Sequence, residues 1–226
     1  MKSLLELIRR PLLYTCIASP AFLFSILLLP NTGFADISIP AKCLSAPTNL
    51  EIDEIPAAVS DFTRIAVLSQ HNGKYEAAFV CSKALLEMVE ANSDTSIGDK
   101  ISAVSLRTDI LKKQNRLDGL IEVYILGLEM IIADGGDDEL EIAIMVSSLS
   151  DFLYIRRDPR AFSSYYAMSK MGACYPIFQS INEIHLQRKN ETAAWHNAKL
   201  FPLPTNETCP TASYFLALAR STRTNN

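Results

Sequence analysis

The sequence predicts an all-α protein, a short α-solenoid of antiparallel helical hairpins followed by a disulfide-braced helical cap. Three observations support this fold class. Apolar residues recur at helical rather than strand spacing, small and apolar residues repeat at a step of 42 residues, and four cysteines follow the first 35 residues. A hydrophobic content of 49% and a charged content of 20% are typical of a globular chain.

Residues 1–35 have the pattern of an export signal. Three basic residues precede an apolar run over 11–29, and the Gly-Phe-Ala sequence at 33–35 resembles a signal-peptidase site. We therefore expect cleavage before Asp36. The alternative keeps the apolar run, about 19 residues long, as a membrane anchor. Either way the positive flank predicts that the rest of the chain lies outside the cytoplasm, in a periplasm or secreted.

The cysteine count also favours an oxidising compartment. Cys43, Cys81, Cys174 and Cys209 lie beyond the export signal, and four cysteines allow three pairings. We favour Cys43 with Cys81 and Cys174 with Cys209, because each bridge would tie a segment of low regularity to a helix. The alternative is that Cys81, which falls on an apolar helix face, is a buried free thiol.

Residues 36–56 are expected to form an extended N-terminal segment, and 57–172 to form three helical hairpins. The predicted units are 57–98, 99–137 and 138–172. Residues at common phases of the 42-residue step are Phe62, Val104 and Val146; Ala66, Thr108 and Ser150; Leu68, Ile110 and Phe152; and Ala77, Gly119 and Ala161.

The expected helix boundaries have suitable chemistry. Pro56 and Pro159 fall where a first helical turn tolerates a missing N–H, and Asp158 is placed to cap the second of these helices. The segment 134–139 contains two glycines and four carboxylates, which suits the end of one helix and the start of the next. It lacks the alternating spacing of a calcium loop, so we interpret it as capping.

The first unit resembles a tetratricopeptide repeat. Residues 73–85 have a glycine, an aromatic residue and then small residues, like the turn and second helix of such a repeat, and Phe62 and Ala66 fit its first helix. Segments 115–120 and 158–162 are fainter likenesses. The period of about 42 departs from the tetratricopeptide period of about 34. The resemblance implies a stack of hairpins with an extended surface for a partner protein.

Residues 173–226 are expected to form the C-terminal cap, with helices over 176–198 and 209–221. His185 lies on an apolar edge of the first helix and is interpreted as a packed histidine rather than a ligand. Trp195 and His196 are interpreted as structural, with an exposed recognition pair as the alternative.

Several function classes are disfavoured by the sequence. A net charge of −4 without a basic block lacks the footprint of a nucleic-acid binder. The chain contains no G-x-S-x-G, H-E-x-x-H or phosphate-binding glycine loop, and its cysteines and histidines lack zinc-site spacing. We therefore expect no enzyme activity, no cofactor and no metal.

The sequence thus predicts a non-catalytic interaction or scaffold module that holds a segment of a protein partner in a helical-repeat groove. Contacts are expected near Arg64, Arg107 and Asp151, and with a membrane only if the N-terminal segment is retained. The alternative is an envelope inhibitor or immunity-type protein that blocks a toxin or hydrolase. Asn190 and Asn206 begin glycosylation sequons that matter only in a eukaryotic host.

Overall fold

The computed structural model describes residue 39 and residues 41–135, 139–179, 182–195, 200–205 and 209–223. All regular elements in these ranges are helical, which confirms the predicted all-α class. The expected export signal over 1–35 lies outside the described residues. Among the helices that are described, none is long and apolar enough to cross a bilayer.

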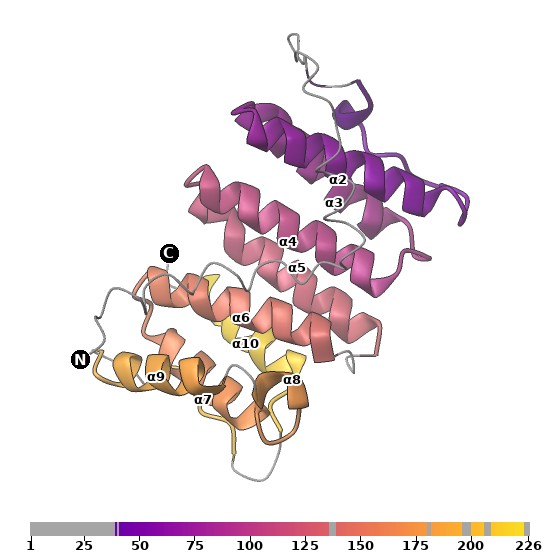
Figure 1. Ribbon diagram of the computed structural model, residues 1–226. Helices are drawn as coiled ribbons and strands as arrows, with labels where there is room; N and C mark the ends of the chain where they lie inside the picture. Colours follow the sequence, from indigo (N-terminus) through magenta and orange to yellow (C-terminus); the bar gives the residue numbers. More distant parts are fainter. Residues whose placement is uncertain are drawn as a thin grey trace, which may run out of the picture. The chain divides into compact units, whose positions relative to one another are not determined.

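Six helices form three consecutive hairpins. Within each hairpin the two helices pack together, and α3 packs on α4 as α5 packs on α6. The first helices also touch their neighbours, because α4 contacts both α2 and α6. Figure 1 shows these helices side by side in chain order, from indigo to orange. Their bounds are α2 (Ile55–His71), α3 (Tyr75–Ala91), α4 (Ile97–Lys113), α5 (Leu120–Ala133), α6 (Glu139–Ile155) and α7 (Arg160–Met171).

The helix ends agree with the expected boundary chemistry. Pro56 lies in the first turn of α2. Pro159 is the N-cap residue of α7, and Asp158, one residue earlier, accepts a hydrogen bond of 2.9 Å from the backbone N–H of Arg160. Gly73 joins α2 to α3 with a φ of 71°, and Gly135 follows α5 with a φ of 114°. Glycine adopts such left-handed conformations at little cost, so both turns can be short.

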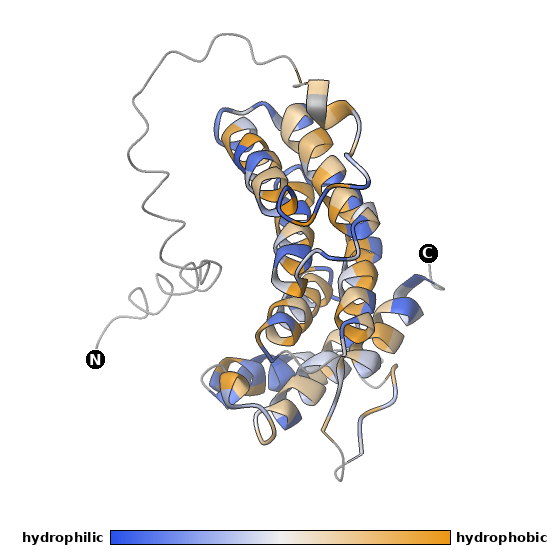
Figure 2. Cartoon of the chain, turned by 90° about the vertical axis from the view of Figure 1, so that its right-hand side faces the viewer, coloured by the Kyte–Doolittle hydropathy of each residue, from blue (hydrophilic) through white to orange (hydrophobic). Residues whose placement is uncertain are grey.

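The 42-residue step is visible in the burial of the first helices. Its two best phases are almost fully buried in all three hairpins: Phe62 (3% exposed), Val104 (0%) and Val146 (0%), and Ala66 (0%), Thr108 (3%) and Ser150 (0%). Figure 2 shows hydrophobic and hydrophilic residues on different sides of the same helices, as expected for amphipathic elements. One phase fails, because Gly119 is exposed in the short 3-10 helix η2 (Leu117–Gly119).

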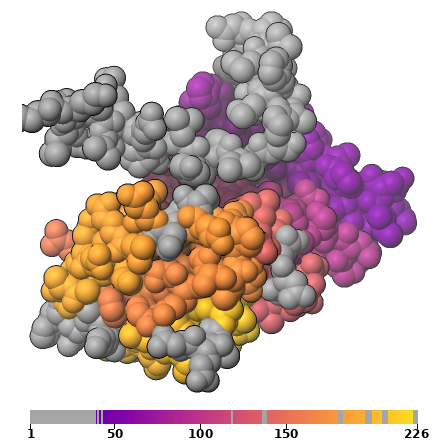
Figure 3. Space-filling model, turned by 60° about the horizontal axis from the view of Figure 1, so that its bottom comes forward, coloured from indigo at the N-terminus to yellow at the C-terminus, as the bar shows by residue number. Residues whose placement is uncertain are grey.

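The cap is built from three shorter helices, α8 (Pro176–Gln179), α9 (Asn182–Ala193) and α10 (Ala212–Arg223). α9 packs on α7 and α8 on α6 and α7, whereas α10 returns to pack mainly on α5. The single helix expected over 176–198 is therefore two helices, and the second expected helix begins at Ala212. Figure 3 shows these orange and yellow segments gathered next to the pink and purple hairpins.

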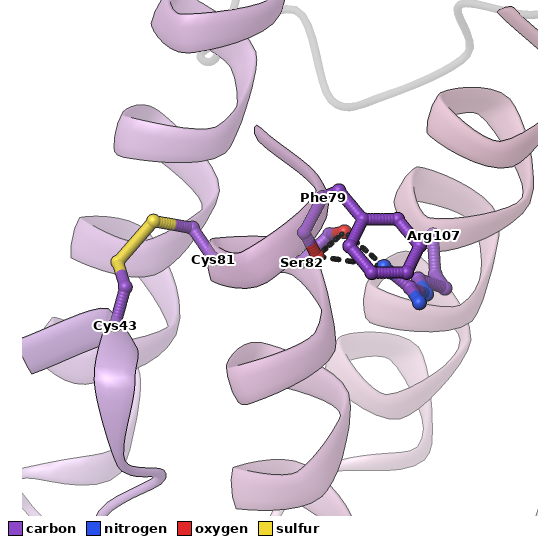
Figure 4. Close-up of a disulfide and its surroundings, with 5 residues drawn as sticks. All are labelled: Cys43, Phe79, Cys81, Ser82 and Arg107. Carbon is purple, nitrogen blue, oxygen red and sulfur yellow. Dashed lines mark hydrogen bonds between the residues drawn. A yellow bond between two sulfur atoms is a disulfide. The ribbon is translucent and has the colours of Figure 1, made fainter. Parts of the chain in front are cut away.

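Both predicted disulfides are present. Cys43 pairs with Cys81, and Cys174 pairs with Cys209. The free-thiol alternative for Cys81 is therefore wrong. The first bridge is buried and attaches η1 (Ala41–Leu44) to α3, so the N-terminal segment is not wholly extended (Figure 4). Two disulfides indicate an oxidising environment outside the cytoplasm.

Candidate interaction surface

The three predicted contact residues lie in three different surroundings. Arg64 on α2 has a side chain that is 61% exposed, with its Nη2 3.4 Å from Asp61 Oδ1. Arg107 on α4 is only 8% exposed, so its expected place on an open surface is wrong. Asp151 on α6 is half exposed and pairs with Arg188 of α9. The structure therefore does not unite them in one contact patch.

Arg107 lies 43 residues after Arg64, which is one residue more than the repeat step of 42. It therefore does not share the exposed helix position of Arg64. One extra residue turns a side chain by about 100° around a helix axis. The residues in phase with Arg107 are Ile65, which is half-buried, and Leu149, which is fully buried. Arg107 thus occupies a position where the other two hairpins have aliphatic residues.

Arg107 faces α3 instead of solvent. Its Nη1 donates hydrogen bonds to the backbone oxygen of Phe79 (2.7 Å) and to Ser82 Oγ (3.1 Å). Its guanidinium lies 3.9 Å from the centroid of the Phe79 ring. Figure 4 shows these groups on the side of α3 opposite the Cys43–Cys81 bridge. Arg107 therefore pins α4 to α3 through neutral groups.

Asp151 belongs to a charged cluster that joins three helices. Its Oδ1 accepts hydrogen bonds from Arg188 Nη1 (2.7 Å) and from the Tyr165 hydroxyl (2.7 Å). Arg188 Nη1 also donates to the Tyr165 oxygen at 3.0 Å, and the guanidinium lies 4.6 Å from the centroid of the Tyr154 ring. This cluster attaches the cap helix α9 to α6 and α7.

The electrostatics of this cluster follow from its burial. Burial lowers the pKa of Arg188, but Asp151 and Tyr165 outweigh that effect and raise it overall. Burial and the adjacent Asp151 carboxylate together raise the pKa of Tyr165. Both groups therefore keep their neutral-pH protonation states, which suits a structural ion pair.

His185 and Trp195 are also packed against this cluster. His185 is 5% exposed, its ring lies 6.2 Å from those of Tyr165 and Phe178, and its Nδ1 has no described hydrogen-bond partner. Burial lowers the His185 pKa to about 4. The half-buried Trp195 ring lies 5.5 Å from Tyr154. His185 is thus a packed histidine, as expected, while His196 lies outside the described residues.

The first helices expose a polar stripe that the sequence analysis did not single out. Its members are exposed or half-buried. Most of them lie on α4 and α6, and the others lie on α2. The 42-residue step indicates part of it, because Thr63, Ser105 and Ser147 share one phase and Ser60 and Ser102 share another. We define the serine stripe as Ser60, Thr63, Ser102, Ser105, Asp109, Ser147 and Ser148.

A shallow hollow lies at the ends of α3, α4 and α5. It is open to solvent and has a volume of about 380 Å³. One of its carboxylates, Glu129, already pairs with Arg220 of α10 at 2.7 Å. Open hollows suit a protruding side chain better than an enclosed small ligand. Its lining residues are Glu90, Ser93, Lys100, Leu126, Glu129, Met130, Ala133 and Asp134.

The remaining candidates are a metal site and the two sequons. In the part of the chain that the structure describes, no three His, Cys, Asp or Glu residues are close enough to hold a metal ion. Asn190 is exposed on α9, and Asn206 lies outside the described residues. Comparison of the chain with protein-family models, curated protein sequences and solved structures gives no match.

Proposed function

We propose that the protein is a non-catalytic interaction or scaffold module that works in a periplasm or after secretion, once residues 1–35 have been removed. In this proposal α2–α7 are three tetratricopeptide-like hairpins. The two disulfides support the location, because such bridges persist in oxidising compartments. The successive packing of the hairpins supports the repeat assignment.

The serine stripe is the observation that carries the proposal. Its members Thr63, Ser105 and Ser147 share one phase of the 42-residue step, so they project from α2, α4 and α6 at similar places around each helix. Short hydroxyl side chains leave backbone and aliphatic surface within reach of a bound segment, and stacked helices present such surfaces side by side. A partner that lies across α2, α4 and α6 would contact all three hairpins.

Site-specific photocrosslinking tests this proposal. A photoreactive residue is placed at position 102, on the serine stripe, and at position 213, an exposed serine on α10. Crosslinking is done in the compartment where the full chain resides. We expect one protein to be captured from position 102 and not from position 213.

A matched pair of variants completes the test. Ser102→Arg should reduce binding of the captured protein, and Ser213→Arg should leave it unchanged, with both variants melting at the wild-type temperature. A hydrolase or toxin as the captured protein, inhibited on binding, would favour the inhibitor alternative over a scaffold. No specific capture at position 102, or equal effects of the two variants, would reject the stripe as the binding surface.

A further inference from the structure

Two guanidinium groups hold one aromatic ring at the junction of the first two hairpins. The Phe79 ring centroid lies 3.9 Å from the guanidinium carbon of Arg107 and 3.7 Å from that of Arg116. Two guanidinium groups cannot stack on one face of a ring at these distances, so the ring lies between them. Phe79 is half-buried, which leaves part of this sandwich at the surface.

Among the described residues, no carboxylate forms an ion pair with Arg107. The nearby Glu87 pairs with Lys83 at 3.2 Å, and Glu76 lies 3.7 Å from Arg116. Burial and then the Arg116 charge lower the pKa of Arg107 to about 10, against the opposing effect of the two glutamates. The group remains a cation at neutral pH in a place that disfavours its charge.

Packing does not require this cation. The equivalent positions of the other hairpins hold Ile65 and Leu149. Aliphatic residues of similar volume in place of buried charged groups often leave stability unchanged or improve it. Arg107 does attach α4 to α3, but an arginine where the other two hairpins have aliphatic residues indicates a role beyond that contact.

The groups around the sandwich are those of a protein-binding surface. Tyr75, at the start of α3, is 53% exposed, and the Arg116 side chain is 47% exposed. Gln114 Nε2 donates a hydrogen bond of 2.7 Å to the Tyr75 backbone oxygen, which holds the end of α4 beside the start of α3. Tyrosine and arginine are enriched among the residues that dominate binding energy at interfaces.

We propose that the arginine–aromatic surface, formed by Tyr75, Phe79 and Arg116 and backed by the buried Arg107, binds an acidic segment of a protein partner. Arg116 donates hydrogen bonds to a carboxylate of that segment, and the buried charge of Arg107 strengthens the attraction. A planar guanidinium matches a carboxylate in a bidentate pair. The two aromatic rings offer apolar area that a free inorganic anion would not use, which favours a peptide segment.

A random library of displayed 12-residue peptides is the probe. It is selected on the full-length protein and depleted on the same protein carrying Arg116→Glu. We expect the enriched sequences to contain Asp or Glu beside an apolar residue. Replacing that acid by its amide in a synthetic peptide should weaken binding at least about tenfold, as for a lost charged hydrogen bond.

Two variants separate binding from folding. Arg107→Leu installs the residue of the equivalent position 149, so it should melt no lower than the wild type yet bind the acidic peptide several-fold more weakly. Arg156→Ala removes an exposed arginine directly after α6 that lies 5.6 Å from the centroid of the Phe152 ring, and it serves as the control, with unchanged peptide binding. Binding should also weaken as salt concentration rises, because exposed charges are screened.

Three results would overturn the proposal: no enrichment, enrichment of peptides without acids, or equal binding by wild type and Arg107→Leu. It rests on the proposed interaction function, but the two can fail separately. A partner captured through position 102 whose binding is indifferent to Arg116→Glu would leave the proposed function intact and reject the acidic segment. Binding of acidic peptides without capture of a protein at position 102 would support the acidic segment and reject the serine stripe as the binding surface.

Discussion

The junction of α3 with α4 and the junction of α7 with α9 each pack an arginine against an aromatic ring, but the charge of the arginine has different partners in the two places. In the described part of the chain, Arg107 donates to a backbone oxygen and a hydroxyl. Arg188 shares the Asp151 carboxylate with the Tyr165 hydroxyl. Burial and the neighbouring Arg116 charge lower the pKa of Arg107 to about 10, whereas Asp151 and Tyr165 outweigh burial and raise the pKa of Arg188.

A pair of buried tyrosines shows the same contrast. Tyr165 donates its hydroxyl proton to Asp151, whereas the Tyr124 hydroxyl in the middle hairpin has no described hydrogen-bond partner. Burial raises the pKa of both phenols. A buried polar group stabilises a fold when it is paired and costs free energy when it is not. The buried tyrosine of the cap junction is therefore held by polar pairing, whereas that of the middle hairpin is held by packing.

The largest expected loss of stability follows removal of a disulfide. Removing each bridge in turn tests whether the two regions depend equally on a covalent crosslink. The two bridges close loops with separations of 38 and 35 residues. Chain entropy then predicts a loss of about 4 kcal/mol for removing either bridge. Double Cys→Ala variants, unfolded in urea, should lose similar amounts. A loss confined to one bridge would show that covalent bracing, rather than polar pairing, distinguishes the regions.

Acid should weaken the cap region through His185. Its folded pKa of about 4 lies below the ordinary value of 6.5, so the unfolded chain binds more protons between these values. Stability is therefore full above pH 6.5 and falls as the pH drops toward 4, by about 2 kcal/mol at pH 5. Asp151 favours the protonated ring and Arg188 opposes it, so both belong to this response.

His185→Phe is the matched variant for this pH response. It keeps an aromatic ring beside Tyr165 and Phe178 and removes the titrating group. Urea unfolding at pH 7 and pH 5 should show a smaller loss in the variant than in the wild type. The same pH dependence in both proteins would place the acid sensitivity elsewhere.

Asp151 and Asp109 give a direct test at equivalent positions of two hairpins. Asp151→Asn should cost about 1.5 kcal/mol, because it removes the charge that Arg188 and Tyr165 share. Asp109→Asn should change stability by less than about 0.5 kcal/mol, since Asp109 is exposed on the surface. Thermal melts of both variants provide the measurement. Equal losses would remove the distinction between the two junctions.

The smallest effect is expected for the tyrosines. Tyr165→Phe should cost about 1 kcal/mol by breaking hydrogen bonds with Asp151 and Arg188. Tyr124→Phe should be neutral or slightly stabilising, because its hydroxyl is buried without a described partner. Chemical unfolding of the two variants side by side resolves the sign. A destabilised Tyr124→Phe variant would indicate a water-mediated partner for that hydroxyl.

The sequence predicts the surroundings of a side chain poorly where a shift of one residue along a helix, or a contact with a distant segment, determines them. Arg107 was expected on the surface, yet its phase is that of Leu149, and a shift of one residue moved it into the α3 contact. The serine stripe shared the 42-residue step but was missed, because polar residues carry no apolar signal. Asp151 was expected to meet a partner and instead meets Arg188, 37 residues away in the chain.

The sequence by itself predicted the helical class and most phases of the buried residues, and among three possible pairings it favoured the two disulfides that form, because amphipathic spacing, turn glycines and the placement of cysteines beside helices are local signals. Only the tertiary structure decided that α10 returns to α5, where Arg220 and Arg223 meet Glu129 and Glu122 over separations of 91 and 101 residues. Contacts at such separations depend on how whole helices pack, and no local period in the chain encodes them.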